Sequence, residues 1–301
     1  MKLVISASPH IDSGATTRKI MGDVLIALLP ALIAAVIIFG WRALLVTAVC
    51  AAACVFFEWG FEKLCHKPST IDDLSAVVTG VILAYNLPVS IPLWHIVIGD
   101  FFAIIVVKQL FGGIGKNFAN PALVGRIVLF LSFSKTMTAW VFPDAVSSAT
   151  PLAQLAAGQK PELWTLLLGN HGGCIGETCA LALLLGGAYL LLRGVITWQT
   201  PVCFVGTVFV LSLILGQDAV RQILSGGLLL GAFFMATDYV TAPQTCWGRA
   251  LFGIGAGLLT CLIRFYGSYA EGVSFAILFM NILTPYLSRW TQSKPLGGAK
   301  A

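Results

Sequence analysis

Long apolar runs recur along the whole chain, and they constrain its fold more than any other feature of the sequence. The runs are centred on residues 24–40, 43–61, 74–87, 92–110, 121–133, 178–192, 201–215, 223–236, 251–265 and 273–287. A helix needs roughly 20 mostly apolar residues to cross the hydrocarbon core of a bilayer. We therefore predict an all-α polytopic membrane protein with about ten transmembrane helices.

The composition agrees with this prediction. Hydrophobic residues make up 58% of the chain and charged residues only 10%, and the mean hydropathy is +0.91. A soluble domain normally contains about 25% charged residues. The net charge of +5 is small and spread along the chain, so we expect contact with membrane lipid and no nucleic-acid partner.

The eight cysteines include no CxxC pair, and most lie inside apolar runs. A free thiol in such a run packs like a small hydrophobic side chain. Cys50 and Cys54 share a helix face and are interpreted as packing residues. The spacing of His171, Cys174 and Cys179 matches no standard zinc or iron–sulfur pattern. We expect no disulfide framework and no metal site.

Three of the apolar runs, at 74–87, 121–133 and 223–236, are shorter than a full membrane crossing. The first ends with Asn-Leu-Pro at 86–88, and Thr-Asp-Tyr follows the third at 237–239. Backbone that leaves helical geometry at membrane depth is tolerated where it lines a cavity or a cofactor. We therefore expect broken helices at these places.

The second half of the chain faintly repeats the first. Segment 80–94 is similar to 231–247, and segment 99–108 is similar to 255–264 at identical spacing. Five spans in each half would invert one half relative to the other, so we expect two inverted five-helix repeats. Chance similarity between glycine-rich segments is the alternative.

Basic residues are unevenly distributed between the two sides of the expected membrane. Ten spans leave both chain ends on one side, and twelve of the 18 Lys and Arg residues fall on that side against five on the other. This bias makes the side of the termini cytoplasmic. The first apolar run is long enough to span and lacks a cleavage site, so we expect it to be retained. The expected organisation is a cytoplasmic N-terminal segment (1–20), a first membrane half (21–135), an external loop (136–175), a second membrane half (176–288) and a cytoplasmic tail (289–301).

The external loop contains the stretch Asp144-Ala-Val-Ser147-Ser148-Ala-Thr150. It resembles the flavinylation motif Asp-x-x-Ser/Thr-Gly-Ala-Thr/Ser, at which a transferase esterifies the terminal threonine with FMN. The resemblance implies that Thr150 is the acceptor, with Ser148 standing where glycine is usual. A helix-capping loop is the alternative, because Ser, Thr and Asp favour helix starts and Pro151 suits a first helical turn.

A second segment, Ser13-Gly-Ala-Thr16, matches the core of this motif more closely. However, His10 occupies the position where the motif has aspartate. The segment is also expected to be cytoplasmic, whereas the transferase acts outside. Both the position of the aspartate and the expected side of the membrane therefore favour Thr150 as the acceptor.

Four further stretches extend the resemblance over essentially the whole chain. They are 8–30, 115–122 with its Gly-x-Asn-x-x-Asn-Pro-Ala signature, the pair 176–178 and 231–238, and 262–281. Together they resemble RnfD, the D component of the Rnf ion-translocating oxidoreductase (Rnf electron transport complex), in the NqrB/RnfD family. The sister protein NqrB, from the sodium-pumping NADH:quinone reductase, has a longer N-terminal extension that is absent here, so RnfD is the better match.

This resemblance implies a membrane electron-transfer component of a ferredoxin:NAD oxidoreductase in the bacterial cytoplasmic (inner) membrane, coupled to Na⁺ or H⁺ movement. The implied partners are the A, B, C, E and G components of the Rnf complex, and no complete active site is expected on this chain alone. The implied cofactors are covalent FMN at Thr150 and non-covalent riboflavin. Asn117 and Asn120 match asparagines at the riboflavin site of the sister protein, and capping of the following helix is the alternative.

Ionisable residues inside a membrane are functional candidates, because lipid penalises them by a few kcal/mol. Arg126 is such a residue, and it could hold a flavin, a phosphate or a carboxylate, or pair with Asp100 or Glu58. Three acidic residues at span edges are candidates for an ion path or for helix capping, with capping favoured. They are Glu177, Asp238 and Glu271.

Two other classes of function remain open. Glycine-rich inverted repeats with broken helices also suit a solute channel or transporter of urea-transporter-like fold. The substitution at Ser148 leaves open a scaffold protein without flavin. A covalently bound flavin would distinguish the expected electron carrier from both.

Overall fold

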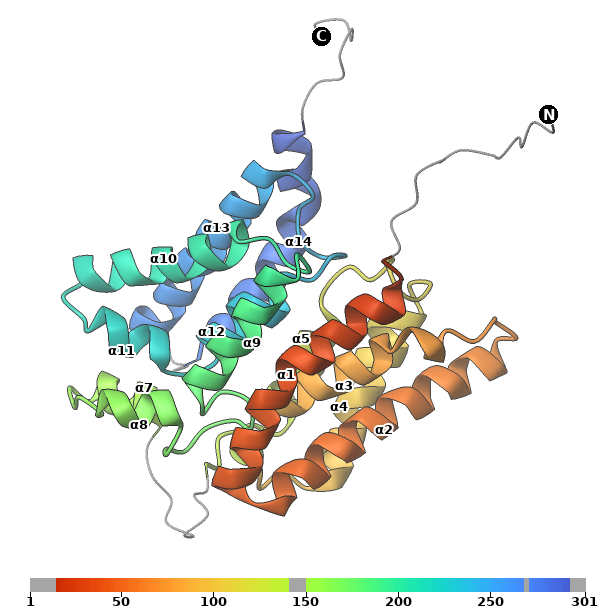
Figure 1. Ribbon diagram of the computed structural model, residues 1–301, viewed down its shortest axis with the longest axis horizontal. Helices are drawn as coiled ribbons and strands as arrows, with labels where there is room; N and C mark the ends of the chain where they lie inside the picture. Colours follow the sequence, from red (N-terminus) through yellow and green to blue (C-terminus); the bar gives the residue numbers. More distant parts are fainter. Residues whose placement is uncertain (1–14, 141–149, 268–270, 293–301) are drawn as a thin grey trace, which may run out of the picture.

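The apolar runs form helices, and every regular element that the computed structural model describes, over residues 15–140, 150–267 and 271–292, is helical (Figure 1). The elements of the first part are α1 (Thr17–Phe39), α2 (Trp41–Leu64), the 3₁₀-helix η1 (Ile71–Asp73), α3 (Ser75–Tyr85), α4 (Leu93–Phe101), the π-helix η2 (Phe102–Gln109), α5 (Pro121–Ser132) and α6 (Ser134–Met137). The others are α7 (Pro151–Ala156), α8 (Leu163–Leu168), α9 (Ala180–Leu192), α10 (Gln199–Ile214), α11 (Ala219–Leu224), α12 (Leu228–Leu230), the π-helix η3 (Gly231–Met235), α13 (Cys246–Tyr266) and α14 (Val273–Thr291).

Side-chain caps explain where two of the long helices, α1 and α13, begin. Thr16 precedes α1, and its hydroxyl accepts a hydrogen bond from the Lys19 backbone N–H at 3.3 Å. Thr245 caps α13 in the same way, accepting from the Gly248 N–H at 3.1 Å. These bonds satisfy N–H groups that have no partner inside the helix. α1 ends at Gly40, whose φ of +75° favours glycine.

The helices form two groups that meet in the middle of the molecule. α2 packs against α3 and α10 against α13, while α1 packs against α9 and α5 against α14 across the middle. The start of α1 and the end of α14 lie on one side, and α7 and α8 lie on the opposite side (Figure 1). Glycine allows the closest approaches: a Cβ at Gly186 in α9 would collide with the Ala27 carbonyl oxygen of α1.

Many large apolar side chains point outward, as expected for lipid contact. Among the described residues, α1, α2 and α13 are long and apolar enough to cross a bilayer, and α3, α5, α9 and α10 are shorter apolar helices. Tryptophans near helix ends are exposed, as in the aromatic belts at membrane surfaces. They are Trp41, Trp198, Trp247 and Trp290. The fold is therefore that of an all-helical membrane protein.

The expected span at 223–236 is interrupted. α11 ends before Gly226, whose φ is +68°, and the chain then forms α12 and the π-helix η3. The first half contains a matching irregularity, because α4 continues into the π-helix η2. Short π-helices inside α-helices are rare and often lie at functional sites.

Candidate functional site

The candidate site residues that the structure describes gather in two cavities. One cavity of about 380 Å³ is lined by Asn117, Asn120 and Asp238, and we call it the asparagine cavity. The other, of about 160 Å³, is lined by Thr150, Arg126, Glu177 and Glu271, and we call it the threonine cavity. Asn120 and Arg126 both belong to the α5 region, six residues apart, which is roughly 9 Å along a helix axis. α5 therefore connects the two cavities.

Asn120 combines two roles in the asparagine cavity. Its Oδ1 accepts a hydrogen bond from the Ala122 N–H at 3.1 Å and so caps α5, which begins at Pro121. Its Nδ2 donates to the Met235 carbonyl oxygen at 3.3 Å, which ties α5 to η3. The capping interpretation is confirmed for Asn120. Asn117 instead shapes the preceding loop, donating to the Ala119 carbonyl oxygen at 3.0 Å.

The walls of the asparagine cavity combine apolar surface with a few polar groups. Met21 and Phe233 contribute apolar surface, and Ser75 and Lys108 contribute polar groups. Such a lining is typical of pockets for organic ligands, as is a volume above about 300 Å³. Asp238 is engaged in its own turn, where it accepts from the Thr241 hydroxyl at 3.0 Å and from the Val240 N–H at 3.4 Å.

Thr150 both caps a helix and lines the threonine cavity. Its hydroxyl accepts from the Ala153 N–H at 3.3 Å at the start of α7, and Pro151 fills the first helical position. The capping geometry expected as the alternative is therefore present at Thr150. Asp144, Ser147 and Ser148 lie outside the described residues.

Arg126 lies at the centre of a buried polar cluster. Its Nη1 donates to Asn86 Oδ1 at 2.7 Å and to Ser274 Oγ at 2.8 Å. Its Nη2 contacts both acidic side chains of the cavity, Glu177 at 3.4 Å and Glu271. These groups come from α3, α5, α14 and two connecting segments. A buried guanidinium with this many partners is fixed in place.

The two acidic partners expected for Arg126 are used elsewhere. Asp100 Oδ1 accepts hydrogen bonds from Cys50 Sγ at 2.9 Å and Cys54 Sγ at 3.2 Å. Glu58 forms a buried ion pair with Lys108 at 2.7 Å. The expectation that Arg126 pairs with Asp100 or Glu58 is wrong, because α2 packs against α4 and η2 and holds both acids there. The two cysteines share a helix face as expected, but they also hydrogen-bond a buried carboxyl group.

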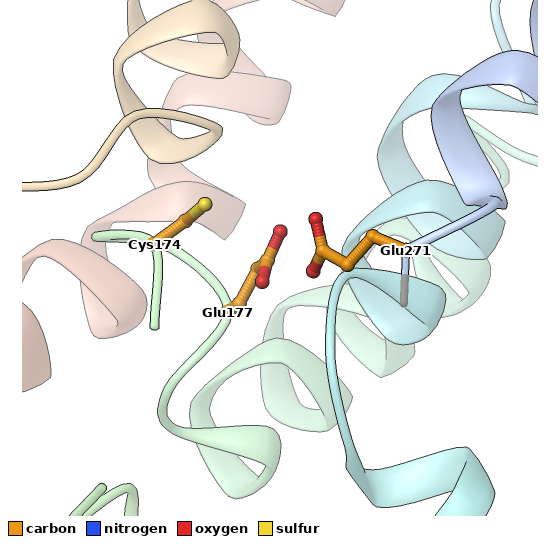
Figure 2. A group of neighbouring side chains, drawn as sticks. All are labelled: Cys174, Glu177 and Glu271. Atoms are coloured by element: carbon orange, nitrogen blue, oxygen red, sulfur yellow. The ribbon is translucent and has the colours of Figure 1, made fainter. Parts of the chain in front are cut away.

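Glu177 and Glu271 are brought together from distant parts of the chain. Their carboxyl groups face each other, and the Cys174 thiol lies beside them (Figure 2). The capping interpretation is wrong for Glu177, which pairs with Arg126. Glu271 does accept from the Gly227 N–H at 3.2 Å, before α12, in addition to its ion pair.

The donor atoms of Cys174, Glu177 and Glu271 lie within 4.8 Å of one another, a spacing that metal ligands also show. However, the guanidinium of Arg126 contacts both carboxyl groups and would repel a cation placed between them. Cys179 is separate, since its thiol donates to the Leu167 carbonyl oxygen at 3.5 Å. The arrangement therefore favours a charge network over a metal centre.

The sequence suggests His171 only as a possible metal ligand, but the residue has a different place in the structure. It lines the threonine cavity and is only 7% exposed. Its Nδ1 lies 3.2 Å from the Gly172 carbonyl oxygen, while its Nε2 has no hydrogen-bond partner among the described residues. Burial in this connecting segment lowers the pKa of His171, so the neutral imidazole is favoured. This nitrogen is therefore free to accept a hydrogen bond from a group in the cavity.

Asn86 connects the two cavities, although its sequence position alone does not mark it as a site residue. It is fully buried at the end of α3. Its Oδ1 accepts from Arg126, while its Nδ2 donates to the Ile82 carbonyl oxygen at 2.6 Å and lies 3.5 Å from Met235 Sδ. The carbonyl oxygen of Met235 in turn accepts from Asn120. The one sequence signal for this residue is the expected helix break at 86–88.

Comparison with known proteins gives a family for the whole chain. Residues 4–297 match the model of the NQR2, RnfD, RnfE family. The chain is 47% identical to the D component of the Na⁺-translocating ferredoxin:NAD⁺ oxidoreductase complex of Acetobacterium woodii, covering 100% of this chain and 97% of that protein. It is 42% identical to the D component of the proton-translocating ferredoxin:NAD⁺ oxidoreductase complex of Clostridium ljungdahlii, covering 97% and 96%.

A third relative, the D component of the ion-translocating oxidoreductase complex of Actinobacillus succinogenes, is 36% identical and covers 97% of both chains. The match extends over both helix groups and both cavities, so it applies to the architecture as a whole. The all-helical membrane fold agrees with it. The chain belongs to the NQR2, RnfD, RnfE family.

Proposed function

We propose that this chain is the RnfD component of an ion-translocating ferredoxin:NAD⁺ oxidoreductase (Rnf) complex and relays electrons between two flavin sites, one at each cavity. The main support is the grouping of the candidate residues, which are scattered in sequence but line two cavities joined by α5. Full-length similarity to the D components of such complexes supports the assignment to the complex. The A, B, C, E and G components would supply the remaining redox centres.

The threonine cavity fits an FMN linked to Thr150 as a phosphoester. The Thr150 hydroxyl lines the cavity, Arg126 supplies a fixed positive charge, and the unpartnered Nε2 of His171 can accept a hydrogen bond. A volume of about 160 Å³ is below the usual range for whole ligands, so the cavity would hold only part of the group. When bound there, the flavin would supply reversible electron-transfer chemistry, and the side chains would hold and orient it.

The asparagine cavity fits a flavin without phosphate, namely riboflavin. Asn117 and Asn120 present amide groups, which can both donate and accept hydrogen bonds. Lys108, a basic residue of its lining, is already paired with Glu58, so a phosphate would find no free counter-charge there. A neutral, partly aromatic ligand is therefore favoured.

Replacing both Asn117 and Asn120 with leucine is expected to remove extractable riboflavin and leave covalent flavin in place, because the amide contacts are lost only in the asparagine cavity. The change also removes the α5 cap, which costs about 1 kcal/mol. Thr245→Val removes the α13 cap away from the cavity and serves as the matched control. Acid extraction and chromatography of purified protein measure the riboflavin. A full complement in the double variant would contradict this site.

The proposed orientation puts the asparagine cavity toward the cytoplasm and the threonine cavity outside the bacterial inner membrane. The positive-inside bias supports this orientation, and so does the fact that the start of α1 and the end of α14 lie on the same side of the molecule (Figure 1).

Pairing of α1 with α9 and of α5 with α14, with one π-helix in each half, supports two inverted repeats of five helices. Asp238 belongs to one cavity and the two glutamates to the other, so an ion path would use both ends of α5.

Fluorescence of a denaturing gel under ultraviolet light tests the proposed function directly. A covalent flavin survives denaturation, so the protein purified from a host with the flavin transferase is expected to give a fluorescent band at 32.0 kDa. A fluorescent band excludes an unmodified scaffold and argues strongly against a solute channel. A band without fluorescence would leave the scaffold or the solute channel as the function instead.

A further inference from the structure

The threonine cavity contains a pair of acidic side chains that the proposed electron transfer does not itself require. Glu177 is 3% exposed, and both it and Glu271 contact the same guanidinium of Arg126. Their carboxyl groups lie within 4.8 Å of each other and face one another (Figure 2). Two carboxylates this close repel each other when both are ionised, and a shared proton relieves the repulsion.

The charges around this pair balance when both glutamates are ionised. The described titratable and charged groups that surround it are Arg126 from α5, His171 and Cys174 from the segment between α8 and α9, and Arg264 from α13. Arg264 and Glu271 both lie beside Gly226, but Arg264 donates to the carbonyl oxygens of Gln222 at 2.7 Å and Ser225 at 3.1 Å. Two positive charges therefore face two negative charges, and one added negative charge would unbalance the site.

A second group that can bind a proton lies in the same cavity. His171 is buried in the same lining, and the bond of its Nδ1 to the Gly172 carbonyl oxygen assigns the proton to Nδ1. Its Nε2 is then an unprotonated acceptor without a partner among the described residues. A neutral imidazole can accept a proton from solvent and release it again.

We propose that Glu177 and Glu271 form a proton-binding site that takes up one proton when the flavin at Thr150 is reduced. This inference rests on the proposed function. One electron enters the flavin from the low-potential donor of the complex. One proton from solvent forms an O–H bond with a glutamate carboxylate, and the pair shares it. The net charge of the buried site stays constant, which lowers the electrostatic cost of reduction.

Infrared difference spectroscopy of dithionite-reduced minus oxidised protein tests this proposal. Reduction is expected to produce a C=O band of a protonated carboxyl group that shifts in D₂O and shifts again when glutamate is labelled with ¹³C. Labelling needs no substitution, so the result does not depend on a variant that folds. The band is expected to disappear in Glu177→Gln and Glu271→Gln and to remain in Glu162→Gln, an exposed glutamate that serves as the matched control.

The outcomes separate this inference from the proposed function. A protein without gel fluorescence contradicts the covalent flavin itself. A fluorescent, reducible protein without a glutamate band contradicts the proton site alone, and so does a band that persists in both glutamine variants. The spectra are recorded with sodium and with choline as the only added cation. A glutamate signal that appears only with sodium would mean metal-cation binding and would overturn proton uptake.

Discussion

Thr150→Val is expected to abolish the fluorescent flavin band and to stop electron flow through the complex, while the protein keeps its fold. Valine is nearly isosteric with threonine and removes only the hydroxyl that would carry the phosphoester. The same hydroxyl caps α7, so the variant also loses about 1 kcal/mol of helix stability. Pro151 still favours the start of this helix. Gel fluorescence and ferredoxin-dependent NAD⁺ reduction by purified complex measure the two effects.

Thr16→Val is a closely matched control for this substitution. Thr16 caps α1 with the same geometry, accepting from a backbone N–H three residues later at 3.3 Å. It does not belong to the lining of the threonine cavity. The Thr16 variant is expected to keep its fluorescent band, and Thr150→Ser is expected to keep it as well because the hydroxyl remains. A band that persists in the Thr150 variant and vanishes in the Thr16 variant would show that Thr16, and not Thr150, carries the flavin.

Arg126→Met is expected to destabilise the protein by about 3–5 kcal/mol, because it leaves the buried carboxylate of Glu177 and the partly buried carboxylate of Glu271 without their common cation. The double variant Arg126→Met with Glu271→Gln is expected to recover part of this loss. Where the single variant can be purified, the potential of the flavin at Thr150 is expected to fall, since a nearby cation stabilises its reduced form. Denaturant unfolding in detergent and a redox titration measure the two quantities.

Arg221→Met provides the comparison for the loss of an arginine ion pair. Arg221 in α11 pairs with Asp218, the residue that caps this helix, and both side chains are partly exposed. Such a pair contributes about 1 kcal/mol or less. Equal losses of stability in the two variants would mean that burial of the Arg126 cluster has no special effect. An unchanged flavin potential in a folded Arg126 variant would leave Arg126 as a structural residue only.

Features that depend on neighbouring residues could be predicted from the sequence. An asparagine or threonine followed by a proline indicated, as the alternative to a cofactor site, helix starts at Pro121 and Pro151, and both helices begin there. Capping involves atoms two or three positions apart, so the local sequence determines it. The apolar runs likewise predicted most helices, because lipid contact requires apolar surface along each of them.

Features that depend on packing between the halves could not be predicted. The two acidic partners of Arg126 lie 51 and 145 residues away, and no spacing rule selects them over Asp100 or Glu58. The same applies to the break between α11 and α12, where Glu271 bonds the Gly227 N–H from 44 residues away. These contacts exist because α5 packs against α14, which is a property of the assembled fold.

The buried amide of Asn86 has a thermodynamic consequence for the two cavities. Through Asn86, a chain of hydrogen bonds runs from Arg126, in the middle of α5, to Met235 and from there to Asn120 at the start of α5. Allosteric linkage is reciprocal, so an occupant of one cavity that changes the affinity of the other has its own affinity changed by the same factor. The amide group of Asn86 is the link through which such a coupling would run.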